Sequence, residues 1–339
     1  MSFVKTLIGA AMGVALLATP AFAQEVTLRL HQFQGPTGNI PAKGLAPWAK
    51  KVEDDSKGRI KIELYPAMQL GGTPPQLFDQ AKDGVVDIIW TVLGYTPGRF
   101  PKSEVFELPF IMGNAEQTSR AFQRFVEANA MDEFADVKLI AVHTHGPGMF
   151  HTKNPVTKIE DLKGMKIRGG SRIVNDFLTA LGAEPIGMPV PAVTEALSKG
   201  VLDGTTIPWE VTVALKVSEL VHNHTGFAGA HGLYTLTFGL VMNKDAYNKL
   251  PDDLKAVIDA NSGIEVAAML GRVMDDGDVP GKQIAMDLKN NIIMLDGEEL
   301  ARFQAVGKDI TDKWIAATPN GQALYDAAVA LVNEEIGAK

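Results

Sequence analysis

The chain has 339 residues, of which 46% are hydrophobic and 21% charged, an ordinary composition for a globular protein of about two domains. Its 40 acidic residues outnumber its 32 basic ones and give a net charge of −8 at pH 7, which argues against a nucleic-acid partner. The lack of cysteine excludes disulfides, thiolate metal sites and cysteine nucleophiles.

The N-terminal residues have the three parts of a secretory signal peptide. Lys5 supplies the positive charge, an apolar run extends from Leu7 to Ala18, and Ala21-Phe22-Ala23 provides the small residues of a cleavage site. We therefore expect residues 1–23 to be a signal peptide that is cleaved after Ala23, and the mature protein to be periplasmic. An uncleaved membrane anchor is the less favoured alternative, because the apolar run is short and interrupted.

Strands and helices alternate along the first part of the mature chain. Alternating or continuous apolar patterns predict strands at 26–31, 60–64, 85–90 and 138–145, with helical patterns between them. This order predicts an α/β fold with mostly parallel sheets, whose ligands bind beyond the carboxyl ends of the strands. Phe33 lies at the end of the first of these strands, Trp90 ends the third, and Tyr95 lies in the loop that comes next.

The break Gly146-Pro147-Gly148 predicts a passage into a second lobe, and residues 231–243 predict the return. We assign 24–146 and about 235–274 to lobe I, and 147–234 and about 275–339 to lobe II. A helical stretch from 251 to about 288 contains Gly271, Gly277 and Pro280, and we expect these residues to interrupt and bend it. Two lobes that the chain joins at least twice predict a hinge and a ligand cleft between them.

One stretch of lobe II predicts an anion site. Residues 161–171 form a turn, a short strand that ends at Arg168, and then Gly169-Gly170 before a helix that Ser171 can cap. The guanidinium offers a planar donor fork that matches a carboxylate, and the glycines let a solute approach the backbone beside it. The alternative is a surface arginine in a salt bridge.

This stretch, Leu181-Gly182-Ala183 and Gly200–Gly204 occur in the order seen in one family, together with Gln69-Leu70-Gly71 and Phe106–Phe110 upstream. The chain resembles the substrate-binding proteins of TRAP (tripartite ATP-independent periplasmic) transporters, in their dicarboxylate-binding-like family. The resemblance implies a two-lobed periplasmic binding protein fold with crossing strands and a long domain-spanning helix. It also implies that Arg168 binds the carboxylate of a small organic acid, which is delivered to ion-gradient-driven TRAP membrane subunits.

The chain departs from this family at the polar half of the pocket. Some members that bind sugar acids carry a second arginine where this chain has Gly148-Met149-Phe150, and an amide where it has Ile207-Pro208-Trp209. We therefore expect a monocarboxylate whose other end is apolar, aromatic or an onium group. Five aromatic residues are candidates to line the cleft, and Glu210 slightly favours a cation; the five are Phe33, Trp90, Tyr95, Phe150 and Trp209. The sequence leaves open an aromatic or branched monocarboxylate and a betaine-like zwitterion.

The remaining patterns predict neither catalysis nor a cofactor. His143-x-His145 and His222-x-His224 have the spacing of a metal pair, but no acidic third ligand is near in sequence, so we expect hydrogen-bonded histidines and no metal. The sequence has no Gly-x-Ser-x-Gly, His-Glu-x-x-His, P-loop or dinucleotide motif. We expect a monomeric binding protein that is not an enzyme. The alternatives are a secreted enzyme acting on a small carboxylate, or a binding protein that serves an ABC transporter or a sensor kinase.

Overall fold

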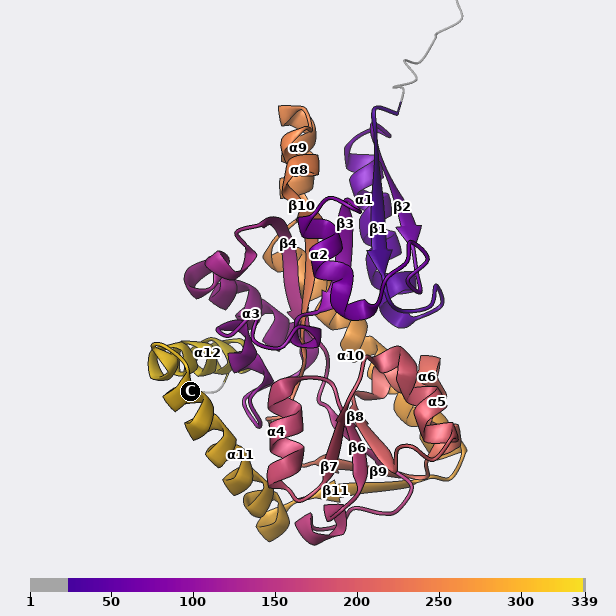
Figure 1. Cartoon of the computed structure of the whole chain (residues 1–339), viewed down its shortest axis with the longest axis vertical. Coiled ribbons are helices and arrows are strands. Elements are labelled where there is room, and N and C mark those ends of the chain that lie inside the picture. Colours follow the sequence, from indigo (N-terminus) through magenta and orange to yellow (C-terminus); the bar gives the residue numbers. More distant parts are fainter. Residues whose placement is uncertain (1–23, 338–339) are drawn as a thin grey trace, which may run out of the picture.

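The computed structural model describes residues 24–337, so the predicted signal peptide lies outside the described residues. The chain forms two sheets, each flanked by helices, and the two layers stand one above the other in Figure 1. We call the layer with β1 lobe I and the layer with β6 lobe II. The two-lobed α/β fold predicted from the sequence is confirmed.

Lobe I contains a five-stranded sheet in the order β2-β1-β3-β10-β4. Its strands are β1 (Val26–Gln32), β2 (Ile60–Tyr65), β3 (Ile88–Val92), β4 (Val137–Thr144) and β10 (Thr237–Asn243). Helices α1 (Ala46–Asp55), α2 (Leu77–Lys82), α3 (Ala115–Asn129), α8 (Lys244–Asn248) and α9 (Asp252–Ala260) accompany it. All residues of β3 and β10 are buried, as expected for central strands. The strand predicted at 85–90 begins later, at Ile88, because Gly84 turns the chain with φ +73°.

Lobe II contains a six-stranded sheet in the order β11-β9-β5-β8-β6-β7. Its strands are β5 (Met149–Thr152), β6 (Lys166–Gly169), β7 (Glu184–Gly187), β8 (Gly204–Ile207), β9 (Asn223–Phe227) and β11 (Asn291–Leu295). Helices α4 (Arg172–Ala180), α5 (Val193–Ser198), α6 (Trp209–Leu215), α7 (Val217–Leu220) and α11 (Gly297–Ala317) accompany it. Sequence reasoning missed β7, β8 and β9, because strands of four or five residues with glycine, threonine or proline give little periodic signal.

The chain crosses between the lobes after β4 and again before β10. Each crossing leads into a strand that is antiparallel to its neighbours: β5 is antiparallel to β8 and β9, and β10 is antiparallel to β3 and β4. The other strand pairs are parallel. The crossings therefore account for both departures from the parallel sheets that the sequence pattern predicts.

The long helix α10 (Ile264–Asp287) packs against α3 of lobe I and α6 of lobe II, and it runs between the two layers in Figure 1. The predicted interruptions at Gly271, Gly277 and Pro280 are wrong, because the helix continues through all three. Its glycines serve close packing: a Cβ at Gly271 would lie 2.6 Å from the carbonyl oxygen of Ala115. The helical stretch is broken earlier, before Gly263, whose φ is +81°.

The C-terminal helix α12 (Gly321–Ile336) packs against α3 of lobe I, where Arg124 pairs with Glu334 and Glu335. The sequence prediction put this segment in lobe II, and the lobe boundaries stay a prediction.

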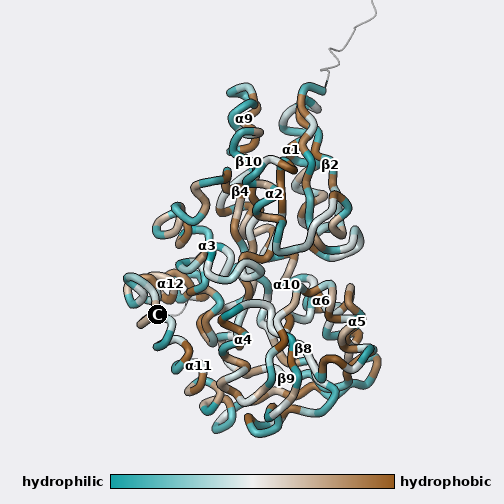
Figure 2. The backbone as a smooth tube through the Cα atoms, in the orientation of Figure 1, coloured by the Kyte–Doolittle hydropathy of each residue, from teal (hydrophilic) through white to brown (hydrophobic). Residues whose placement is uncertain are grey.

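Hydrophobic and hydrophilic residues are mixed along the helices in Figure 2. Within residues 24–337, no helix combines the length and apolar character that a bilayer crossing requires.

Candidate functional site

A cavity with about 370 Å³ of empty space lies between the lobes, near the ends of their strands. The 370 Å³ includes space that is open to solvent, and the room for water-sized molecules is only about 30 Å³, so the lining side chains lie close together in this structure. Lobe I, the crossing segments and α10 contribute Phe33, Gln34, Tyr95, His145, Tyr234, Leu236, Phe238 and Met274. Lobe II contributes Arg168, Val190, Ile207, Pro208, Glu210 and Val211. Four of the predicted site residues therefore lie in one lining: Phe33, Tyr95, Arg168 and Glu210.

Arg168 is the next-to-last residue of β6 and is only 1% exposed. Its Nε donates to the carbonyl of Met188 at 2.9 Å and its Nη1 to that of Thr206 at 3.3 Å, but its Nη2 has no hydrogen-bond partner within residues 24–337. A Cβ at Gly170 would lie 3.1 Å from Nη2 and 2.5 Å from Leu236 Cδ1, so a side chain there would crowd the guanidinium. A surface salt bridge is therefore the wrong interpretation. Arg168 is a buried cation held by carbonyls, with one donor unused.

Two tyrosines lie in the same lining as Arg168. Tyr234 is 1% exposed, and its hydroxyl oxygen likewise has no partner in the described part of the chain. Burial raises the pKa of Tyr234 to about 12, so it stays protonated and can donate. The Tyr95 hydroxyl oxygen accepts from the backbone N–H of Val190 at 2.9 Å, which joins lobe I to lobe II. Arg168 Nη2 and Tyr234 thus supply two uncommitted donors to one cavity.

Aromatic rings form a stack along one wall of the cavity. Trp90 lies between Phe33 and Phe238, with ring centroids 4.9 Å and 5.2 Å away and nearly parallel planes. The Trp90 Nε1–H donates to His143 Nε2 at 2.8 Å. Trp90 is fully buried behind the lining rather than in it, so it supports Phe33 and Phe238 instead of facing the cavity.

Phe150 and Trp209 lie outside the lining, contrary to the sequence prediction. Phe150 packs into the core of lobe II, 6.2 Å from the ring centroids of Phe227 and Phe303. Trp209 packs against His151 and His224, at 5.1 Å and 4.8 Å. The reason is geometric: alternation along β5 directs Phe150 to the side of the sheet that α11 covers, and the first residue of α6 faces inward while the next residue, Glu210, lines the cavity.

Glu210 is buried in the lining, and its backbone N–H donates to Asp278 Oδ1 at 2.7 Å. Burial, with the negative charge of Asp278 second, raises the pKa of Glu210 to about 8, while the Asn39 side chain and the charge of Lys43 act in the opposite direction. The carboxyl group is therefore mostly neutral at pH 7. This neutrality weakens the support that Glu210 gave to a cationic solute.

The histidine pairs make hydrogen bonds with protein groups. His143 accepts from Trp90, and His145 Nε2 accepts from the N–H of Leu236 at 3.0 Å. His224 is within hydrogen-bonding distance of His151 Nδ1, at 2.7 Å, and of Asn290. Burial lowers the pKa of His143 to about 3 and that of His145 to about 4. No group of three or more acidic or histidine side chains suited to a metal occurs in residues 24–337.

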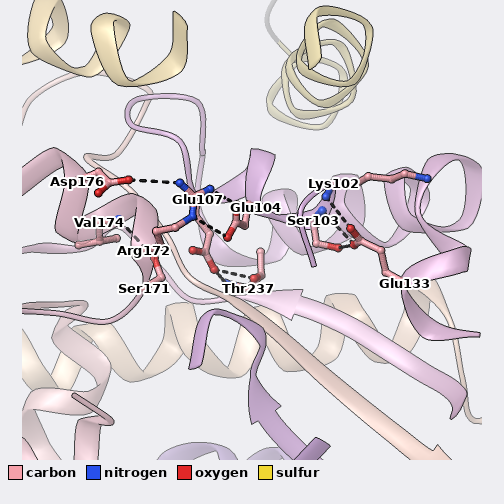
Figure 3. Close-up of polar contacts among 10 residues, drawn as sticks. All are labelled: Lys102, Ser103, Glu104, Glu107, Glu133, Ser171, Arg172, Val174, Asp176 and Thr237. Carbon is pink, nitrogen blue, oxygen red and sulfur yellow. Dashed lines mark hydrogen bonds and ion pairs between the residues drawn. The ribbon is translucent and has the colours of Figure 1, made fainter. Parts of the chain in front are cut away.

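The lobes also meet at an ion pair beside the cavity, which Figure 3 shows. Arg172, the first residue of α4, pairs through Nη2 with Oε2 of Glu104 in η4 (Ser103–Glu107) of lobe I. Its Nε also lies 3.4 Å from Glu104 Oε1, and Nη1 lies 3.3 Å from Asp176. Glu104 is buried, whereas the Arg172 side chain is 44% exposed. We call this contact the interlobe ion pair.

Sequence reasoning missed Gln34, His145 and Tyr234 as lining residues. His145 and Tyr234 lie on the two segments that cross between the lobes, and Gln34 directly follows Phe33 at the end of β1. Their positions in the chain could have identified them as lining residues, because the segments that join two lobes border the cleft between them.

Comparisons with known proteins agree with this arrangement. Residues 33–317 match the family model described as bacterial extracellular solute-binding protein, family 7 (DctP). A TRAP solute-binding protein from Rhodoferax ferrireducens with copurified benzoate is 48% identical, with a TM-score of 0.89, over 91% of this chain and 98% of that one. A marine metagenome TRAP solute-binding protein specific for aromatic acids, with 3-hydroxybenzoate, is 46% identical, with a TM-score of 0.90, over 92% and 99%. A Bordetella bronchiseptica TRAP protein with bound mandelate is 30% identical, with a TM-score of 0.83, over 92% and 98%.

Proposed function

This chain belongs to the DctP family, the bacterial extracellular solute-binding proteins of family 7, and on that premise we propose that it captures an aromatic monocarboxylate between its lobes for TRAP membrane subunits. The observation that carries the proposal is the Nη2 of Arg168, which has no hydrogen-bond partner among the described residues and lies in a cavity whose other walls are mostly apolar. A buried cation without a counter-ion is costly, and a solute carboxylate removes that cost.

We assign the carboxylate to Arg168 and Tyr234. Arg168 Nη2 and the Tyr234 hydroxyl both lack partners in the described residues, and each can donate to one carboxylate oxygen. The Tyr95 hydroxyl accepts from Val190, so its own hydrogen can make a third donation. His145 stays neutral and leaves Arg168 as the positive charge of the carboxylate site.

We favour an aromatic solute over a betaine-like zwitterion. Phe33 and Phe238 both stack on Trp90 and offer apolar ring surface to the cavity, with Val190, Ile207 and Leu236 in the same lining. A zwitterion would need a counter-charge for its onium group, and Glu210 is mostly neutral at pH 7. The benzoate and 3-hydroxybenzoate in the two relatives of nearly half-identical sequence support the same choice.

A thermal-shift screen followed by titration calorimetry tests this proposal. Benzoate, 3-hydroxybenzoate and mandelate should raise the melting temperature, because a ligand that binds only the folded state stabilises it by mass action. Glycine betaine, succinate and glucuronate are the comparison set. A large shift from one of these three, with none from the aromatic acids, would contradict the proposed solute class.

The family is extracytoplasmic, and its relatives in these comparisons are solute-binding proteins. We propose further that residues 1–23 are removed after Ala23, that the mature protein acts as a monomer, and that it releases its solute unchanged. Mass spectrometry of the exported protein, its sedimentation, and chromatography of the solute recovered after denaturation test these three points. Chemical conversion of the solute would indicate an enzyme instead.

A further inference from the structure

A second polar site in the cavity is centred on Gln34. The side-chain Oε1 of Gln34 is buried and has no hydrogen-bond partner in residues 24–337, although Gln34 belongs to the lining. A buried amide oxygen without a donor has lost its hydrogen bonds to water and gained none in return, which is unfavourable. A solute that brings a hydrogen-bond donor to this point would therefore bind more tightly than one that does not.

The backbone that carries this side chain is fixed by its surroundings. The Gln34 carbonyl accepts from the Gln32 side chain at 2.8 Å and from the Ala67 N–H at 2.8 Å, and the Gln34 N–H donates back to Gln32. A Cβ at Gly38 would lie 2.9 Å from Gln34 Oε1, so the absence of a side chain at Gly38 leaves room for the amide in this position. The backbone of Gln34 is thus held in place before a solute arrives.

Glu210 reaches the same corner from lobe II. A Cβ at Gly277 would lie 2.5 Å from Asn39 Nδ2 and 2.5 Å from Glu210 Cγ, so Glu210 lies beside Asn39. Asn39 follows Gly38, whose backbone borders the Gln34 amide. Gln34 and Glu210 therefore approach one turn, residues 38–39, and both belong to the lining of one cavity.

This corner is separate from the carboxylate site. The charge of Arg168 contributes to the pKa values of Tyr95, Tyr234 and His145, which marks them as its neighbours. The pKa of Glu210 responds instead to burial, Asp278, Asn39 and Lys43. Apolar lining residues, among them Ile207 and Met274, complete the cavity. A solute with an acidic group at Arg168 can thus present a different group to Gln34.

We propose that Gln34 and Glu210 form a hydroxyl-recognition site, and that the preferred solutes are aromatic monocarboxylates with a hydroxyl group on the ring. This inference rests on the proposed function. The phenolic O–H donates to Gln34 Oε1, and its oxygen accepts from the neutral carboxyl group of Glu210. A bare or methylated ring leaves Gln34 Oε1 without a donor, and sites built to bind a hydroxyl discriminate strongly against analogues that lack it.

Titration calorimetry at pH 7 with size-matched solutes tests the inference. We would compare 3-hydroxybenzoate with 3-methylbenzoate, and 4-hydroxybenzoate with 4-methylbenzoate, on the full mature protein. In the wild type, one hydroxy isomer should bind about tenfold more tightly than its methyl partner, the size expected for an otherwise unmade buried hydrogen bond. Gln34→Leu should reduce this ratio to about twofold or less, and Glu210→Met should do the same. Gln69→Leu, an exposed glutamine outside the lining, is the matched control and should keep the wild-type ratio.

Equal affinities within both pairs in the wild type would overturn the inference, and so would an unchanged ratio in both cavity variants. Melting curves identify a variant that does not fold, in which case the other variant decides. If the wild type binds none of the four acids, the proposed function itself fails. Binding of all four without a hydroxyl preference leaves the proposed function intact and rejects only the hydroxyl site.

Discussion

The ring of Tyr234 lies against the backbone of Gly148, where an added Cβ would stand 2.1 Å from Tyr234 Cε1. The backbone N–H of Gly148 also donates to the carbonyl of Tyr234 at 2.9 Å. This contact joins the two crossing segments, one after β4 and one before β10. The resemblance places a second arginine in this region in some relatives, and here an aromatic ring fills the space beside residue 148 instead.

Tyr234→Phe should weaken aromatic acid binding by about tenfold, because it removes one uncommitted donor and keeps the ring that packs on Gly148. Gly148→Ala should weaken it further, since the ring must move to admit a methyl group. Calorimetry with benzoate measures both effects. Gly35→Ala is the control, because its Cβ would meet open space. Unchanged affinity in both Tyr234→Phe and Gly148→Ala would remove Tyr234 from the carboxylate site.

Arg168→Met should abolish high-affinity binding, at a cost of about 2–5 kcal/mol in binding free energy, because a charge-assisted pair in a closed cavity is lost. Arg168→Lys should fail nearly as badly, since lysine keeps the charge but lacks the planar fork that also holds Met188 and Thr206. Arg302→Lys, in an exposed pair with Glu160, controls for the loss of a guanidinium elsewhere. Near-normal affinity of Arg168→Met would rule out the proposed carboxylate contact.

Glu104→Gln should weaken solute binding about two- to fivefold without touching the cavity, because it breaks the interlobe ion pair with Arg172. The effect is small because the Arg172 side chain is partly exposed, and it should shrink further in high salt. Asp132→Asn removes the Lys102–Asp132 pair within lobe I and should leave affinity unchanged. Equal effects of the two substitutions on solute affinity would show that the interlobe ion pair does not hold the two lobes together around the solute.

Glu210→Gln should change how stability depends on pH. The pKa of Glu210 is about 8 in the folded protein and near its ordinary value when unfolded, so the folded state holds an extra proton between about pH 4.5 and 8. The free energy of unfolding of the wild type should therefore fall as pH rises through this range, relative to the variant. The maximum slope is about 1.4 kcal/mol per pH unit. Asp278, whose pKa is raised to about 7 mainly by burial, remains in both proteins.

Urea unfolding at pH 5, 6, 7, 8 and 9 measures this difference. The two curves of stability against pH should diverge from pH 5 to 8 and run parallel above pH 8. If they stay parallel throughout, Glu210 titrates normally in the folded protein, and its neutral state cannot be used to argue against an onium solute.

Gly281→Ala should destabilise the protein by about 1–3 kcal/mol, although alanine is the better helix former by up to about 1 kcal/mol. The reason is that a Cβ at Gly281 would lie 2.2 Å from the carbonyl oxygen of Trp209, where α10 meets α6. Val279→Ala, at a 71% exposed position of the same helix, should change stability by less than about 0.5 kcal/mol. A stabilised Gly281→Ala protein would show that the two helices can separate at little cost.

Local sequence determined several of the strands and helix starts of the fold. Alternating apolar residues predicted the strands β1 and β2, and Ser171 caps α4 as predicted, because these signals depend only on near neighbours. The strand–Gly-Gly–helix pattern placed Arg168 correctly at the end of β6, and the resemblance identified the family.

Contacts between distant segments decided the rest. Phe150 and Trp209 point away from the cleft. Packing with other segments decides which side of the sheet Phe150 occupies and which face of α6 carries Trp209, and the local sequence does not encode this packing. Gly271 and Gly277 looked like helix breaks, yet they let α10 approach its neighbours closely. Glu210 became a neutral group only because burial and Asp278, 68 residues away in the chain, act on it together. Tertiary structure also brought Tyr234 and Gln34 into the cavity with Arg168. The cavity exists only once the two lobes meet, and only then are the polar groups that line it removed from water.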